Sequence, residues 1–326
     1  MLDAMEKPSA PTDSAPIRIF CGADRSQQLA FRVLADSIRR NTSRDIEIRA
    51  IDNGDAPTVA DPRHAPYTEF SFARFAIPAL AGRHGRAIYL DSDMLVFRDI
   101  TELWDAPLDD AQVAIEIGSR SDPAQTAHAR NRHAAVMLLD CAGLDWDVER
   151  IVAGLGRDYD YNALMTLDPV LAPGQLREAI PRGWNDLDLF DPERTRLLHF
   201  TEIRTQPWVS TNHPHGALWV DAVRRMLAEG TLANADIQTG IAAGYARPSL
   251  ALELGLQTAA NVNTDSLSSL TDFDRAQGFL PHRELLARFA QRKRAIARAE
   301  RDFAAARAPP LAWWHRLRYR LRHGPD

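Results

Sequence analysis

Short apolar runs alternate with helical patterns along the first half of the chain, and this alternation limits the possible folds more than any other feature. IRIFCG at 17–22 and DIEIRAID at 45–52 have strand character, and apolar residues recur at helical spacing between them. A strand, a helix and a strand in this order predict a parallel pair joined by a crossover. Further strands are predicted at 86–90, 111–118 and 133–141. We therefore expect an open, mostly parallel α/β sheet flanked by helices.

The chain divides into three stretches. Residues 1–16 are rich in Pro, Ser, Ala and Asp, which predicts a flexible leader. The α/β pattern occupies 17–275 and includes a predicted helix at 69–82. Residues 276–326 predict a helical C-terminal extension, with one long charged helix at 281–308 followed by a basic, aromatic end.

Composition excludes several classes of protein. A hydrophobic content of 45% in 326 residues supports a large core, and a net charge of −5 argues against a nucleic-acid partner. Cys21 and Cys141 lie in or beside apolar runs and are expected to be reduced core thiols. The start lacks the features of a secretory signal, and no stretch reaches the roughly 18 apolar residues of a membrane span, so we expect a cytoplasmic protein.

Two aspartates end the most apolar of the predicted strands. In AIYLDSDMLVF at 87–97, Asp91 and Asp93 follow one apolar run and precede another. The ligand crevice of an open α/β sheet lies outside the carboxyl ends of its strands. With a turn at Ser92, both carboxylates would reach one ligand, and carboxylates that hold Mg²⁺ or Mn²⁺ usually also serve substrate phosphates. The pattern predicts a metal site for a diphosphate, with a turn that caps backbone amides as the alternative.

Four ordered stretches carry a family resemblance that covers residues 17–210. YLDSDMLVFRDITELW resembles the D-x-D strand of the glycosyltransferase family 8 group, whose fold is of the GT-A type. IRIFCGADRSQQLAF resembles its first nucleotide-binding strand and helix, and TEFSFARFAIPAL resembles the helix with a donor-contacting arginine. AAVMLLD resembles the strand often written GVMLiD, and HFTEIRTQPW resembles the His-containing segment before a Pro-Trp pair.

The resemblance implies roles for particular residues. Asp91, Asp93 and His199 would coordinate Mn²⁺ or Mg²⁺, and the nucleotide-sugar pyrophosphate would complete the coordination. The cation would stabilise the negative charge that develops on the leaving nucleoside diphosphate. Arg74 would contact the donor sugar or diphosphate. The other expected donor-binding residues are Cys21, Gly22, Asp24, Ser92, His133 and Arg204.

The sequence departs from the family pattern at several of these places. Ala23 and Ser26 stand where the family often has an aspartate and an aromatic residue that stacks on uracil, and this weakens the prediction that the base of the donor is uridine. Gln206 replaces a lysine, and Arg204 is the candidate for the missing positive charge. Tyr161 replaces a glutamine that lies near the anomeric carbon in relatives.

The family retains the anomeric configuration of the donor sugar. A double displacement requires a carboxylate nucleophile, and Asp160 beside Tyr161 is the nearest candidate. A same-face mechanism, in which the departing phosphate oxygen helps to deprotonate the acceptor, demands less of the protein. We favour the second mechanism on that ground.

The C-terminal end resembles nothing in the family. In 311–323, two tryptophans precede a run in which arginines alternate with leucine and tyrosine. Such a stretch predicts contact with a membrane surface, here the inner face of the cytoplasmic membrane. A terminal helix packed on the domain or an oligomer contact is the alternative.

Together these features predict a metal-dependent, retaining glycosyltransferase that uses a nucleotide-diphosphate sugar, UDP-linked in the first instance. The expected acceptor is a glycan or lipid-linked glycan, such as that of bacterial lipopolysaccharide or capsule. A nucleotidyltransferase would need a Gly-rich phosphate loop with a lysine, and GADRSQQ has neither. A binding or scaffold protein that has kept the fold and lost turnover is the third possibility.

Overall fold

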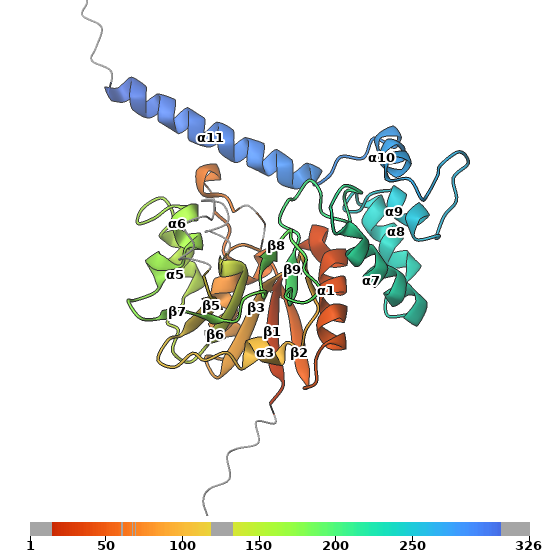
Figure 1. The fold of residues 1–326 in the computed structure, drawn as a ribbon. Coiled ribbons are helices and arrows are strands. Elements are labelled where there is room, and N and C mark those ends of the chain that lie inside the picture. Colours follow the sequence, from red (N-terminus) through yellow and green to blue (C-terminus); the bar gives the residue numbers. More distant parts are fainter. Residues whose placement is uncertain (1–14, 60, 67, 69, 119–132, 308–326) are drawn as a thin grey trace, which may run out of the picture.

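The computed structural model describes residues 15–59, 61–66, 68, 70–118 and 133–307, and its centre is a six-stranded sheet (Figure 1). The strand order is β2-β1-β3-β6-β5-β7. The strands are β1 (Ile17–Gly22), β2 (Ile46–Ile51), β3 (Arg86–Asp91), β5 (Val113–Glu116), β6 (Val136–Asp140) and β7 (Leu176–Ile180). The predicted open, mostly parallel sheet is confirmed. The sequence had not indicated that β6 runs antiparallel to both β3 and β5.

The sheet is buried on both faces, which explains why its strands are nearly continuous apolar runs. Alternate residues of β1 point to opposite sides: Ile17, Ile19 and Cys21 pack in one core cluster, and Phe20 packs in another. The helix α1 (Gln28–Arg40) connects β1 to β2, and these two strands pair in parallel from Ile17 opposite Ile46. The predicted strand, helix and strand unit is therefore present.

A small second sheet determines which residues lie opposite the Asp-Ser-Asp turn. It has the order β4-β9-β8, with β4 (Met94–Val96), β9 (Leu197–His199) and β8 (Asp186–Leu187). β4 and β9 run antiparallel with Met94 opposite His199, and the Phe200 amide donates to the Asp93 carbonyl at 2.8 Å. The second apolar run after the aspartates therefore pairs with a strand a hundred residues further along the chain.

The helix predicted at 69–82 is shorter than expected. A 3₁₀ turn, η4 (Ala73–Ala76), leads into the single turn of α2 (Ile77–Leu80), and Pro78 lies in the first turn of α2, where its missing N–H costs least. Gly82 follows with a φ of 71°, which is the left-handed conformation that glycine adopts readily.

The other regular elements of the described chain are mainly helices, joined by loops and turns (Figure 1). The shorter ones are α3 (Thr101–Trp104), α5 (Val148–Ala153), α6 (Tyr161–Met165), α7 (Gly216–Glu229), α8 (Asn234–Ala242), α9 (Ser249–Glu253) and α10 (Leu267–Ala276). The long predicted helix is α11 (Arg283–Arg307), and it runs across the same edge of the sheet as the loops that follow β3 and β9. Within the described residues, no helix is both long enough and apolar enough to cross a bilayer. The predicted leader, apart from its last two residues, and the 311–323 stretch lie outside the described part of the chain.

Candidate functional site

The three predicted metal ligands lie together at the carboxyl end of β3. One ligand atom each from Asp91, Asp93 and His199 lies within 4.8 Å of the others. The chain bends at Ser92 and Asp93 between β3 and β4, which is the turn that two carboxylates spaced i and i+2 require. The pairing of β4 with β9 then brings His199 opposite this turn.

Each of the three side chains is held by a neighbour. Asp91 Oδ1 accepts hydrogen bonds from the Arg74 guanidinium at 3.2 Å and from the Tyr89 hydroxyl. Gln206 Nε2 donates to Asp93 Oδ2 at 2.8 Å and to the Phe200 carbonyl at 2.8 Å. Gln206 therefore fixes an aspartate of the cluster, in a place where the family resemblance led us to look for a lysine.

The histidine presents a lone pair to the aspartates. His199 is buried, and its Nδ1 lies 2.9 Å from Asn185 Oδ1, an acceptor that requires the proton on Nδ1. Nε2 then carries a lone pair and lies 3.2 Å from Asp93 Oδ1, without hydrogen-bond geometry. Asp93 Oδ1 is buried and has no hydrogen-bond partner within the described chain. A cation between these atoms would satisfy both, so the residues fit a divalent metal with mixed oxygen and nitrogen ligands.

Burial and the neighbouring charges act in opposite directions on the Asp91 carboxyl. Burial raises the pKa of its carboxyl above the ordinary value, Arg74 opposes this rise, and the negative charge of Asp93 adds to it. Arg74 is itself buried, since its side chain is 6% exposed. Its guanidinium also donates to the carbonyls of Ser71 and Ala134, at 3.0 and 2.6 Å. Arg74 is therefore a structural partner of Asp91 as well as a residue of the cavity wall.

A cavity of about 460 Å³ opens beside the three ligands. Half of the predicted site residues line it, namely Arg74, Asp91, Asp93, Tyr161, His199 and Arg204. Arg204 is exposed at its rim. Its walls come from the turn after β3, from α6, from the segment after β9 and from the first turns of α11.

Other predicted residues lie outside this cavity. Cys21 is buried within the core of β1, where burial raises the pKa of its thiol, and Ser92 is buried in the turn. A Cβ on Gly22 would lie 2.3 Å from the Phe70 ring, so this glycine makes room for Phe70 at the strand end. Asp24 lines an adjacent cavity of about 340 Å³ and accepts hydrogen bonds from the Ser26 amide and hydroxyl.

The remaining two predicted residues differ in what the structure says of them. Asp160 is exposed and caps α6 by accepting from the Ala163 amide at 2.8 Å, so it is not brought into the cavity. The backbone of His133 opens the 3₁₀ turn η5 (His133–Ala135), and its side chain lies outside the described part of the molecule.

Sequence reasoning missed the α11 side of the cavity. Leu285, Leu286 and Phe289 line it, although they lie beyond the predicted boundary of the catalytic domain at 275. Their spacing of i, i+1 and i+4 on an otherwise charged helix is a local apolar stripe, and this stripe was the available signal. Asn185, which orients His199, has no comparable signal because it lies in the turn before β8 and its partner lies 14 residues away in β9.

The segment that follows His199 is held by Asp188. Asp188 accepts hydrogen bonds from the Thr201 amide at 2.8 Å, from the Thr201 hydroxyl and from His213 Nε2 at 3.1 Å. Burial disfavours ionisation of this carboxyl, but the hydrogen bonds from His213 and Thr201 outweigh burial and lower its pKa from 3.8 to about 2.

This shift predicts an acid-sensitive contribution to stability. Because the folded pKa lies below the unfolded value, the stabilisation is complete above the unfolded pKa and is lost as the pH falls through the folded value of about 2. Asp188→Asn is expected to lower the free energy of unfolding at pH 6 by about 2 kcal/mol and to flatten its pH dependence below pH 4. Urea unfolding across this range checks both effects, with the exposed Asp110→Asn as control. An unchanged acid limb in Asp188→Asn would contradict the assignment.

Part of the chain matches a known protein family. Residues 19–135 match the family model described as Glycosyl transferase family 8, which confirms the resemblance drawn from the sequence. Protein CDI of Arabidopsis thaliana is 30% identical over 143 residues, or 40% of this chain and 55% of that protein. The chain thus spans about half the length of this curated relative.

Solved structures with a similar backbone are glycosyltransferases. Galactosyltransferase LgtC in complex with donor and acceptor sugar analogs has a TM-score of 0.47 and 16% identity, covering 69% of this chain and 100% of its own. The bifunctional glycosyltransferase WbbM, in its apo form, has a TM-score of 0.47 and 15% identity, covering 66% and 50%. GlyE of Streptococcus pneumoniae TIGR4 has a TM-score of 0.45 and 14% identity, covering 64% and 60%. At TM-scores below 0.5 these likenesses identify no substrate for this chain.

Proposed function

We propose that this chain, in which residues 19–135 match glycosyl transferase family 8, is a metal-dependent glycosyltransferase. It moves a sugar from a nucleotide-diphosphate donor to a glycan or lipid-linked glycan, and a UDP-sugar is the first candidate for the donor. The observation that carries the proposal is the cluster of Asp91, Asp93 and His199 in the wall of a cavity large enough for part of a nucleotide sugar. A peripheral membrane location through 311–323 is a further part of the proposal.

The two aspartates and the histidine would hold Mn²⁺ or Mg²⁺. Bound there, the cation would neutralise the charge that develops on the leaving diphosphate. The neighbouring side chains position the ligand atoms of Asp91, Asp93 and His199 for the cation. Arg74 donates to Asp91 and opposes the rise in its pKa that burial causes, and Gln206 donates a hydrogen bond to one oxygen of Asp93. Asn185 keeps the Nε2 lone pair of His199 directed at the site.

The carboxylates around the cavity favour a same-face mechanism. Within the described residues, those that line it are Asp91, Asp93 and Glu202, and two of these are the proposed metal ligands. Asp160, the nucleophile candidate, is engaged as an exposed helix cap. We therefore propose that the configuration is retained because the leaving phosphate oxygen and the acceptor hydroxyl share one face of the sugar.

The donor is identified by ligand-dependent stabilisation. We expect a UDP-sugar, among UDP-, GDP-, ADP- and CMP-sugars, to raise the melting temperature, and to do so only with Mn²⁺ present. At a ligand concentration of 100 times Kd, binding to the native state alone adds about 2.7 kcal/mol to the free energy of unfolding. Mn²⁺ alone and each nucleotide with EDTA are the controls. If no donor shifts the melting temperature with Mn²⁺, the enzyme assignment fails, and a binding or scaffold protein that has lost turnover is the favoured alternative.

A further inference from the structure

The first two turns of α11 close the cavity that contains the proposed metal ligands. Leu285, Leu286 and Phe289 line it, so its wall opposite the sheet edge comes from a helix far along the chain. In Figure 1 this helix lies over the sheet edge instead of packing against a face of the sheet. Its first turns can close the cavity only if the helix is held at a particular height above the edge.

Arg292 connects this helix to the rest of the fold one turn beyond the residues that line the cavity. Its side chain is buried, although it belongs to a helix whose other basic residues are mostly exposed. Its guanidinium carbon lies 4.7 Å from the centre of the Tyr161 ring, within the range of a cation–π interaction. Its Nε also donates to the Arg63 carbonyl at 3.1 Å. Arg292 thus connects α11 to α6 and to the 3₁₀ turn η3 (Pro62–His64).

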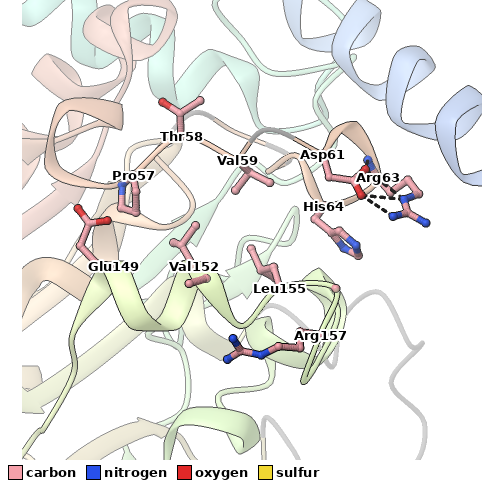
Figure 2. A pocket seen from close by; sticks show the side chains of 12 residues that line it. Pro57, Thr58, Val59, Asp61, Arg63, His64, Glu149, Val152, Leu155 and Arg157 are labelled. Atoms are coloured by element: carbon pink, nitrogen blue, oxygen red, sulfur yellow. Dashed lines mark hydrogen bonds and ion pairs between the residues drawn. The ribbon is translucent and has the colours of Figure 1, made fainter.

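The turn η3, whose Arg63 carbonyl accepts from Arg292, also lines a second cavity, of about 430 Å³. Figure 2 shows Arg63 paired with Asp61 beside α11, while His64 points to the other side, toward the turn after α5. A Cβ on Gly156 would lie 2.3 Å from His64 Nε2, so the imidazole is packed closely on that turn. The carbonyl that accepts from Arg292 therefore belongs to a turn that His64 holds against the turn after α5.

The α6 side of the contact continues to the metal ligands. The Tyr161 hydroxyl donates to Ser71 Oγ at 3.1 Å, and the Ser71 carbonyl accepts from Arg74 Nε at 3.0 Å. Arg74 then donates to Asp91. One run of direct contacts thus joins a basic residue of α11 to a proposed metal ligand. Its second member, Tyr161, lies in the cavity wall.

We propose that α11 is a wall of the substrate cavity and that Arg292 is a positioning residue, which holds this wall through Tyr161 and the Arg63 carbonyl. The assignment of the cavity to a nucleotide sugar rests on the proposed function, whereas the role of Arg292 in closing the cavity does not. With α11 in place, water is kept from the donor and transfer to the acceptor is favoured over hydrolysis.

A cysteine placed in the cavity reports on the wall without any substrate. Met165 is buried and lines the cavity, and the native Cys21 and Cys141 are buried, so Met165→Cys gives one reporter thiol among the described residues. In the Met165→Cys protein, Arg292→Ala is expected to raise the rate of maleimide labelling about tenfold, because the loss of one favourable cation–π contact corresponds to a change of that size in the opening equilibrium. Arg292→Lys should restore much of the slow labelling because it keeps a cation. Arg294→Ala, two residues along and exposed, is the matched control and should leave the rate unchanged.

Two readouts separate failure of this inference from failure of the proposed function. Equal labelling rates in the Arg292→Ala and Arg294→Ala backgrounds would overturn the positioning role, whatever the chain binds. If Arg292→Ala speeds labelling, the wall is supported, and absence of protection by UDP with Mn²⁺ would then count against the nucleotide-sugar assignment alone. With the native Met165, Arg292→Ala is also expected to raise the ratio of donor hydrolysis to transfer about tenfold. An unchanged ratio would show that α11 does not exclude water from the donor.

Discussion

Replacing Asp91 and Asp93 together with asparagine is expected to abolish Mn²⁺-dependent nucleotide binding and to lower sugar transfer by at least about a thousandfold. The amide oxygens are weak ligands for a hard cation compared with carboxylates, so the site would lose its charge while it keeps its shape. Titration calorimetry of UDP with and without Mn²⁺ measures binding, and release of UDP in the presence of acceptor measures turnover.

A matched control exists in the same sheet. Asp140 also ends a strand, but β6 is antiparallel to β3, and Arg86 at the start of β3 pairs with Asp140 in register. Asp140 therefore lies at the opposite edge, and Asp140→Asn should bind and turn over as the parent does. Metal-dependent binding that survives in the doubly substituted protein would place the cation elsewhere.

Replacing Arg74 with alanine is expected to lower the free energy of unfolding by about 3–5 kcal/mol in the absence of metal, because it leaves the carboxylate of Asp91 partly buried without its cation. The Ser71 and Ala134 carbonyls lose their donors as well. Since burial already raises the pKa of Asp91 and Arg74 opposes that rise, the pKa should move further up. Protonation of Asp91 would then compete with metal binding, so the metal affinity should increase more steeply with pH than in the parent.

The Arg74 experiment has an internal test. A divalent cation beside Asp91 would replace the missing positive charge. At a pH where Asp91 is ionised in both proteins and at the same free Mn²⁺ concentration, Mn²⁺ should therefore bind the Arg74→Ala protein more tightly and stabilise it more than the parent. Arg86→Ala is the control, because the Arg86 guanidinium donates to the Trp104 carbonyl at 3.0 Å and faces no carboxylate of the cluster. Equal stabilisation of both proteins by Mn²⁺ would mean that the cation does not bind at Asp91.

The position of the cluster follows from local sequence to a large extent. The run AIYL predicts a buried strand, and carboxylates just beyond its end must lie at the ligand edge of the sheet. The i and i+2 spacing also requires the bend that the structure shows at Ser92 and Asp93. His199 was reached through the family resemblance, since nothing in its own neighbourhood says which strand it will face.

Other parts of the site depend on contacts that have no local signature. Asn185 and Gln206 are ordinary polar residues in the sequence, and they hold His199 and Asp93 only because β8 and β9 join β4 in a second sheet. Asp160 is a carboxylate at the expected place in the sequence, yet the start of α6 turns it into an exposed cap.

The sequence by itself determined five of the six strands, the open sheet and the carboxylates at the end of β3, because hydrophobic periodicity and strand-end chemistry are properties of neighbouring residues. It did not indicate β7. Only the tertiary structure decided that β6 is antiparallel, that β9 brings His199 to Asp93, and that α11 closes the cavity through Arg292 and Tyr161. Each of these rests on a pair of elements far apart in the chain, and the energy of such pairing depends on the fit of whole surfaces, which no local pattern records.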